Sequence, residues 1–238
     1  MKLNKLALNL TLLVAFTLLV HGAGYAQSTI FNIPSTDAVA KGKTYLEFDF
    51  ISHLEGHDDG GFQTYVPRAV FGAGKGVEIG VNVAATSSGS PTVVYLQPNI
   101  KWQFYSKSES GVAMTGGAIL YTPLNHRSSN DTFGLFYGNA SKKFKGDHGP
   151  RLTIGGYGLA GYDFPGRDKG GAMVGYEQPL TKKVSFVTDW FSGDNAFGYA
   201  TPGFSLSLPK NSVFNIGYSF GNFGRKNNAL FLYYGITF

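Results

Sequence analysis

The chain closes with the stretch Ala229-Leu-Phe-Leu-Tyr-Tyr-Gly-Ile-Thr-Phe238. Apolar residues occupy every second position of this stretch: Leu230, Leu232, Tyr234, Ile236 and Phe238. Successive side chains of an extended strand point to opposite faces, so this spacing puts all five on one face. The stretch therefore predicts a β-strand that has one apolar face and ends on an aromatic residue.

This ending resembles the last strand of bacterial outer-membrane β-barrels, whose assembly depends on an aromatic final residue. The resemblance implies an all-β fold, a transmembrane antiparallel up-and-down β-barrel surrounded by outer-membrane lipid and lipopolysaccharide. It also implies that Tyr234, Ile236 and Phe238 form the signal that the barrel-assembly machinery reads.

The other end of the chain has the pattern of a secretory signal. Lys2 and Lys5 precede an apolar run over residues 6–20, and Gly24 and Ala26 are small residues at the −3 and −1 positions. The run is shorter than the roughly 20 residues that a membrane-spanning helix needs. We therefore expect a signal peptide over residues 1–26, cleaved after Ala26. The sequence contains no Cys, which excludes a disulfide framework and a lipid anchor on Cys.

Composition agrees with a barrel wall. The sequence has 33 Gly, 14 Tyr and 20 Phe, and no long apolar run follows the signal, because only alternate residues of a spanning strand meet lipid. The formal charge of +5 falls by two when Lys2 and Lys5 are removed. The other Lys and Arg residues are scattered through expected turns, so no nucleic-acid-binding surface is predicted.

About twelve alternating segments fill residues 43–238, each close to the ~9–11 residues of a spanning strand. Residues 77–85, 96–104 and 213–220 alternate clearly, whereas 132–141 and 151–162 are rich in Gly and their register is open. Both ends of the barrel are expected on the periplasmic side, so the strand number is even, and ten or fourteen strands are alternatives. Short periplasmic turns are expected at 72–76, 106–110, 145–150, 181–183 and 209–212. Longer outer loops are expected at 53–61, 87–91, 123–131, 163–171, 192–196 and 222–228.

Polar residues on the expected inward faces predict a lumen-lining set, because facing lipid would be costly for them. The set is Glu47, Asp49, Arg68, Glu78, Asn99, Lys101 and Asp189. These residues either form a constriction that selects small polar solutes or pair with one another in a closed lumen. Later strands carry many Gly and Ser, so one side of the lumen is expected to be open.

The segment 27–42 precedes the expected barrel. Ile30, Phe31 and Ile33 give it an apolar centre ahead of Pro34. It is interpreted either as a small plug inside the lumen or as a periplasmic tail.

Two further patterns have the residue types of chemical sites. His53, Glu55 and His57 lie on one side of an extended segment and could bind a divalent ion, but polar loops commonly carry such residues, and no metal is predicted. His126 and Ser128 are similar in spacing to the catalytic pair of outer-membrane phospholipase A. They lie in a polar loop without the other motifs of that family, so no enzyme is predicted.

The whole chain resembles small porin-like or transporter-type barrels of Gram-negative bacteria, including the segments 189–195 and 233–238. The resemblance implies a channel for passive diffusion of small hydrophilic solutes, without a cofactor, as a monomer or trimer. The alternatives are a closed structural or adhesive barrel that acts through its outer loops, and an outer-membrane lipase.

Overall fold

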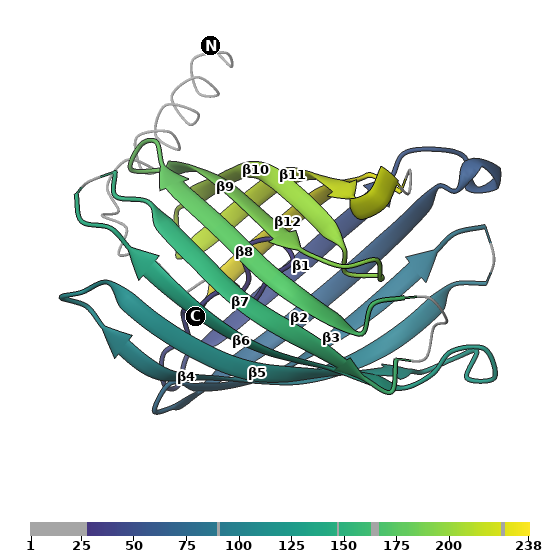
Figure 1. Cartoon of the computed structure of the whole chain (residues 1–238), viewed down its shortest axis with the longest axis horizontal. Helices are drawn as coiled ribbons and strands as arrows, with labels where there is room; N and C mark the ends of the chain where they lie inside the picture. Colours follow the sequence, from purple (N-terminus) through teal and green to yellow (C-terminus); the bar gives the residue numbers. More distant parts are fainter. Residues whose placement is uncertain (1–27, 90, 147, 163–166, 225–226) are drawn as a thin grey trace, which may run out of the picture.

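The computed structural model describes residues 28–238 except 90, 147, 163–166 and 225–226. The expected signal peptide over residues 1–26 lies outside the described residues. The described chain forms a closed barrel of twelve strands in which every neighbouring pair is antiparallel (Figure 1). The predicted all-β fold and the predicted number of strands are confirmed. Among the residues that the structure describes, no helix is long and apolar enough to cross a membrane.

The strands follow one another around the barrel in sequence order. Their bounds are β1 (Thr44–His53), β2 (Phe62–Gly74), β3 (Val77–Ser87), β4 (Val93–Lys107), β5 (Val112–Pro123), β6 (Phe133–Lys143), β7 (Arg151–Ala160), β8 (Gly170–Pro179), β9 (Val184–Phe191), β10 (Tyr199–Leu208), β11 (Ser212–Gly221) and β12 (Ala229–Thr237). Two short 3₁₀ helices, η1 (His57–Asp59) and η2 (Asn222–Gly224), lie in connections.

The barrel closes where β1 pairs with β12, from Tyr45 opposite Thr237 to Ser52 opposite Leu230. Beyond that register, the N–H of Phe238 donates to the carbonyl of Thr44 at 2.9 Å. Closure gives every strand two neighbours, which lets backbone polar groups pair without water, as crossing a bilayer requires.

The connections differ between the two ends of the barrel. At the end where β1 begins and β12 finishes, hereafter the terminal end, they are short, such as residues 75–76 and 209–211. Lys75 and Gly76 have φ of 53° and 75°, the conformation of a two-residue type I′ hairpin turn. At the opposite end, hereafter the loop end, the connections are mostly longer, such as residues 161–169.

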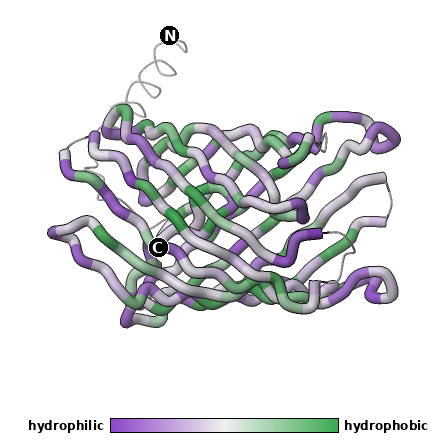
Figure 2. Tube along the Cα trace, in the orientation of Figure 1, coloured by the Kyte–Doolittle hydropathy of each residue, from purple (hydrophilic) through white to green (hydrophobic). Residues whose placement is uncertain are grey.

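The alternation along the strands separates a lipid-facing surface from the lumen. Ile79, Ile100 and Trp102 are about half exposed on the outside, and Figure 2 shows apolar colour along the wall and polar colour at the barrel ends. The segments predicted at 77–85, 96–104 and 213–220 lie in β3, β4 and β11. The Gly-rich stretches whose register was open form most of β6 and β7, which pair continuously from Gly134 opposite Ala160 to Lys143 opposite Arg151.

Candidate functional site

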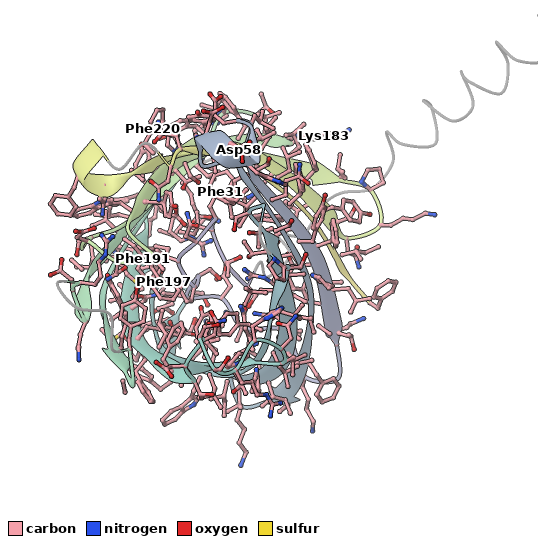
Figure 3. All side chains as sticks on the ribbon, turned by 90° about the vertical axis from the view of Figure 1, so that its right-hand side faces the viewer. Phe31, Asp58, Lys183, Phe191, Phe197 and Phe220 are labelled. Carbon is pink, nitrogen blue, oxygen red and sulfur yellow. The ribbon has the colours of Figure 1, made fainter. Side chains whose placement is uncertain are left out.

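The chain ahead of β1 lies inside the barrel as a hairpin, which we call the plug (residues 28–39). The N–H of Ser35 donates to the carbonyl of Ser28 at 3.0 Å, and the N–H of Ile30 donates to the carbonyl of Ile33 at 2.9 Å. The chain therefore reverses at residues 30–33 before it returns to β1. Figure 3, viewed from the loop end, shows Phe31 within the ring of strands.

The tip of the plug is apolar and buried. Ile30, Phe31 and Ile33 are 1%, 0% and 0% exposed. The ring of Phe31 meets the ring of Phe231 edge to face at 5.5 Å and that of Tyr233 at 6.2 Å. The plug is thus packed against β12 as part of the main buried cluster.

Inward glycines make room for this tip. A Cβ at Gly175 would lie 2.6 Å from Cδ1 of Ile30, and a Cβ at Gly217 would lie 2.7 Å from Cζ of Phe31. Real Cβ atoms do not approach so closely, so larger residues here would displace the plug. The expectation of an open side of the lumen fails at these two glycines, where plug side chains fill the space, but serines of β9–β11 line a cavity nearer the terminal end.

Asp189 holds the tip by its backbone. Its Oδ2 accepts the N–H groups of Phe31 at 2.9 Å, Asn32 at 2.6 Å and Ile33 at 2.8 Å. Its Oδ1 accepts the side-chain amide of Asn32 at 3.0 Å, and that amide also donates to Thr201 at 2.7 Å. Hydrogen bonds to an ionised acceptor are stronger than neutral ones, and here one carboxylate satisfies three consecutive backbone donors.

A buried ion pair holds both arms of the plug. Nζ of Lys101 lies 2.9 Å from Oε1 of Glu78, and the two side chains are 3% and 2% exposed. Glu78 accepts the hydroxyl of Ser28 at 2.8 Å and the N–H of Val39 at 2.8 Å. Nζ of Lys101 also donates to the carbonyl of Ser28 at 3.2 Å. One pair of wall residues thus contacts both ends of the hairpin.

The returning arm is bonded to β4 and β6. The Asn139 amide donates to the carbonyl of Pro34 at 2.6 Å, and the hydroxyls of Thr36 and Ser141 lie 2.5 Å apart. The Gln103 amide donates to the carbonyl of Thr36 at 2.7 Å.

Arg151 fixes the plug near the terminal end. Its Nη1 lies 2.6 Å from Oδ2 of Asp37, while Nε and Nη2 bind the carboxylate of Glu177 at 2.5 and 2.7 Å. Asn215 and Tyr233 also donate to backbone carbonyls of the plug, those of Ile30 and Thr29. Among the described residues, side chains of eight strands hydrogen-bond to the plug: β3, β4, β6, β7, β9, β10, β11 and β12.

A second charged cluster lies on β1 and β2. Nη1 of Arg68 is 3.3 Å from Oε1 of Glu47, and its Nε is 2.9 Å from Oδ2 of Asp49. The Tyr45 hydroxyl donates to Oε2 of Glu47 at 2.5 Å. Both carboxylates are buried, whereas the Arg68 side chain is 20% exposed. Two carboxylates facing one guanidinium leave this cluster one negative charge in excess when all three groups are ionised.

The structure places all seven residues of the predicted lumen-lining set on the inward face. Three of the charged groups described above contain six of them: Glu47, Asp49 and Arg68 in one, Glu78 and Lys101 in another, and Asp189 alone at the tip of the plug. Asn99 donates to Asn82 at 3.3 Å and to the carbonyl of Gln97 at 3.2 Å. The six charged residues pair with one another or with the plug.

A cavity of about 570 Å³ opens at the loop end, and we call it the vestibule. Phe31, Asn32 and Arg68 contribute to its lining. Much of the rest of its wall is aromatic: Phe62, Tyr95, Tyr121, Phe133, Tyr162 and Phe197. Such walls accept the flat or apolar side of a small solute, and Arg68 offers hydrogen-bond donors to its polar groups. Sequence analysis missed this feature, because its rings come from strands and loops that only barrel closure brings together.

The plug separates the vestibule from a cavity at the terminal end. That second cavity has about 460 Å³ and is lined by polar groups that include Asp37, Arg151 and Glu177. A void of about 30 Å³, roughly the volume of one water in the liquid, lies beside Ser28 and Arg68 between plug and wall. In this conformation plug residues border both cavities and this void.

The two weaker candidate sites lie at the loop end. His53 contacts the carbonyl oxygen of Asn228 through Nδ1, and its ring stacks on Phe62 at 6.2 Å. The described residues contain no group of three or more His, Asp or Glu side chains arranged to hold a metal ion. His126 and Ser128 lie in the connection after β5, where the carbonyl of His126 accepts the Ser129 hydroxyl at 3.2 Å.

Comparison with known proteins gives a likeness of fold. No protein-family model matches the chain, and no curated protein matches it. The COG4313 outer membrane channel from Pseudomonas putida F1 is a similar solved structure, with a TM-score of 0.52 and 13% identity over 92% of this chain and 100% of that chain. A protein solved in a study of in-meso crystallization of membrane proteins has a TM-score of 0.46 and 13% identity over 82% of this chain and 83% of that chain. The likeness to the first of these structures shows a shared barrel fold.

Proposed function

We propose that this protein is a channel for passive diffusion of small hydrophilic solutes across the outer membrane of a Gram-negative bacterium, with the plug as its gate. The observation that carries the proposal is a lumen with charged side chains and a cavity at each end, divided by a hairpin that belongs to no strand of the wall. The plug is closed in the described conformation, and displacing it would join the two cavities.

The surroundings of the plug support a gate. An isolated two-stranded hairpin is marginally stable in water, so its shape depends on contacts with the wall. Those contacts are mainly hydrogen bonds and ion pairs, and water can replace such bonds at a net cost of about 0.5–1.5 kcal/mol for each neutral one. The wall left behind would carry Glu78, Lys101 and Asp189, side chains that line a hydrated pore well.

The proposed orientation places the terminal end in the periplasm and the loop end outside the cell. In that arrangement residues 1–26 act as a signal peptide cleaved after Ala26, and the barrel-assembly machinery reads Tyr234, Ile236 and Phe238. Solutes would enter the vestibule from outside and leave beside Arg151.

A disulfide between plug and wall tests the gate. The sequence has no Cys, and the hydroxyls of Thr36 and Ser141 lie 2.5 Å apart, so the double variant Thr36→Cys/Ser141→Cys can be cross-linked selectively. We expect the oxidised protein to be silent in a planar bilayer and to show conductance steps after reduction. Oxidised and reduced protein with the same conductance would refute gating by the plug.

A cross-link within the wall is the matched control. The hydroxyls of Thr64 and Thr86 lie 2.9 Å apart on β2 and β3, so Thr64→Cys/Thr86→Cys adds a disulfide that leaves the plug free. Its conductance should be the same before and after reduction.

The second candidate is a closed barrel that acts through its outer loops. Hydrogen bonds from eight strands to the plug favour it. Protein that is folded and heat-modifiable on a gel, yet silent in both redox states and after deletion of residues 28–38, would establish this candidate over the channel.

A further inference from the structure

Lysine side chains surround the terminal end of the barrel. At least one exposed lysine lies in or beside each connection there and ahead of β1, and we call this set the lysine rim: Lys43, Lys75, Lys107, Lys145, Lys182 and Lys210. Because successive connections are spaced around the closed barrel, these side chains form a ring and not a patch on one side.

Acidic residues are fewer than lysines at this end. Its described connections contain Glu109, whose Oε2 lies 4.0 Å from Nζ of Lys107, and the sequence adds Asp147 two residues after Lys145. Acidic residues gather instead at the loop end, where Glu55, Asp58 and Asp59 are exposed in the first connection. The lysine rim is therefore a strongly positive surface on an otherwise mixed molecule.

The rim lies at the edge of the lipid-facing surface. Exposed apolar side chains occur within four residues of most rim lysines: Phe71, Tyr105, Phe144, Leu180 and Leu208. A lysine beside such residues extends its ammonium group to the level of lipid headgroups while its methylenes stay in apolar surroundings. The adjacency favours a membrane lipid over a periplasmic polymer as the partner.

We propose that the lysine rim binds the phosphates of anionic phospholipids, phosphatidylglycerol and cardiolipin, in the leaflet at the terminal end. Basic residues next to a membrane attract anionic headgroups, and the attraction is screened by salt. The six rim positions would surround the barrel with anionic lipid and set its depth in the bilayer. This inference requires that the barrel span a membrane, but it does not require that the lumen conduct.

The chain carries a built-in probe for this leaflet. It has two tryptophans, and Trp102 is 54% exposed on the outside of β4, opposite Val77 at the beginning of β3. Lys75 lies two residues before Val77, so Trp102 is close to the rim. Trp190 lies near the loop end of β9, where its ring N–H donates to Asn222 at 3.1 Å.

Quenching by brominated lipid tests the proposal. The variant Trp190→Phe, refolded into phosphatidylcholine vesicles with increasing dibrominated phosphatidylglycerol, reports lipid exchange at Trp102. Dibrominated phosphatidylcholine gives the reference. We expect Trp102 to contact phosphatidylglycerol about fivefold more than phosphatidylcholine, because one lysine near the membrane surface contributes about 1 kcal/mol to the binding of an anionic lipid. In high salt the ratio of the two lipids should fall towards one, because salt screens the attraction. Lys75→Gln/Lys107→Gln in the same background should abolish the preference.

Two controls separate the rim from general effects. Lys182→Gln/Lys183→Gln removes the same charge on the other side of the barrel, between β8 and β9, and should leave the preference at Trp102 intact. Trp102→Phe leaves Trp190 as the probe and should show equal quenching by both lipids.

The proposal is overturned if Trp102 shows no preference, or if the preference survives Lys75→Gln/Lys107→Gln. Lysine-dependent binding to isolated peptidoglycan, without lipid preference, would overturn it in favour of the polymer. Quenching is measured on the folded barrel without any current, so either result leaves the channel proposal untouched.

Discussion

Phe31 of the plug lies edge to face against Phe231 of the last strand, with ring centroids 5.5 Å apart and planes at 81°. Edge-to-face pairs add about 0.5–1.5 kcal/mol beyond the area they bury. The contact joins the first described residues of the chain to its final strand inside the lumen. Closure of the lumen thus depends on apolar packing at the tip as well as on polar bonds along the arms.

Phe31→Ala should weaken the docking of the plug. Truncating a buried Phe typically costs about 3–5 kcal/mol, and here the cost falls on the docked state. We expect conductance steps at least about 100-fold more frequent than in the parent protein, measured in planar bilayers. Phe48→Ala, on the lipid-facing side of β1 with 47% exposure, is the control and should leave the frequency unchanged. Equal frequencies in all three proteins would contradict a role for the tip.

Asp189→Asn should loosen the same tip through its backbone. The substitution keeps the shape of the side chain but removes the charge on which the N–H groups of Phe31, Asn32 and Ile33 converge. A hydrogen bond to a charged group contributes about 1.5–3 kcal/mol, so losing the charge should raise the open fraction about tenfold or more. Asp131→Asn in a loop-end connection is the control. A more tightly closed channel would show that Asp189 does not hold the plug.

Arg68→Ala should shift ion selectivity toward cations. Its removal leaves Glu47 and Asp49 without their guanidinium, which makes the lining more negative below the vestibule. The reversal potential in a KCl gradient, recorded on the reduced Thr36→Cys/Ser141→Cys protein, measures the shift. Arg68→Lys retains the charge and should keep the parental value. An unchanged reversal potential in the Ala variant would exclude Arg68 from the conducting path.

Lys101→Met should destabilise the fold more than Glu78→Gln/Lys101→Met does. Removing one partner leaves the other charge buried and unpaired, which typically costs about 3–5 kcal/mol, whereas removing both relieves the uncompensated carboxylate. Urea unfolding in lipid vesicles, followed by tryptophan fluorescence, gives the free energies. The single variants Glu78→Gln and Lys101→Met complete a double-mutant cycle. Additive effects of the two changes would show that the pair is not coupled.

Phe238→Ala should reduce assembly in cells without preventing refolding. The side chain is 60% exposed, while its backbone bonds to Thr44 do not depend on it. We expect less heat-modifiable protein in outer membranes than the parent gives, and normal yields on refolding into detergent. Phe204→Ala, an exposed aromatic change within β10, should assemble normally. If Phe238→Ala reduced refolding into detergent as much as assembly in cells, the variant would have a folding defect and not a lost assembly signal.

The strands were predictable because alternate residues face lipid and lumen, and lipid favours apolar side chains whereas the lumen accepts polar ones. In β3 and β11 the apolar and polar residues alternate without exception over several pairs, so the lipid-facing side could be read directly. The inward positions of Asp189 and Arg68 followed from the same rule. In the Gly-rich strands β6 and β7, the residues of the two faces differ little in polarity. Their register therefore depends on pairing with the neighbouring strands and could not be predicted from their own sequence.

The partners of the plug were beyond sequence reasoning. Ile30, Phe31 and Ile33 indicated an apolar segment. The segment lacks the two-residue alternation of a spanning strand, so its sequence does not predict which strands it contacts. The useful signal was the inward glycines, since Gly175 and Gly217 leave space that only another part of the chain can fill. From the sequence alone, that space predicts an opening. The aromatic vestibule was missed for a similar reason, because Tyr121 and Phe133 meet through pairing of β5 with β6.

The contacts of the plug tip with Asp189 and with Tyr233 also constrain the order in which the molecule can form. They span 158 residues between Phe31 and Asp189, and 204 between Thr29 and Tyr233. Contacts this distant in sequence form late, because the entropy of closing so long a loop must be overcome first. The arms of the plug can bond to β3, β4, β6 and β7 as soon as these strands have folded, but the bonds of its tip form only when β9–β12 have joined the wall. A barrel that has lost its last strands therefore loses the bonds that fix the tip, and the plug is fully docked only in a molecule whose wall is complete.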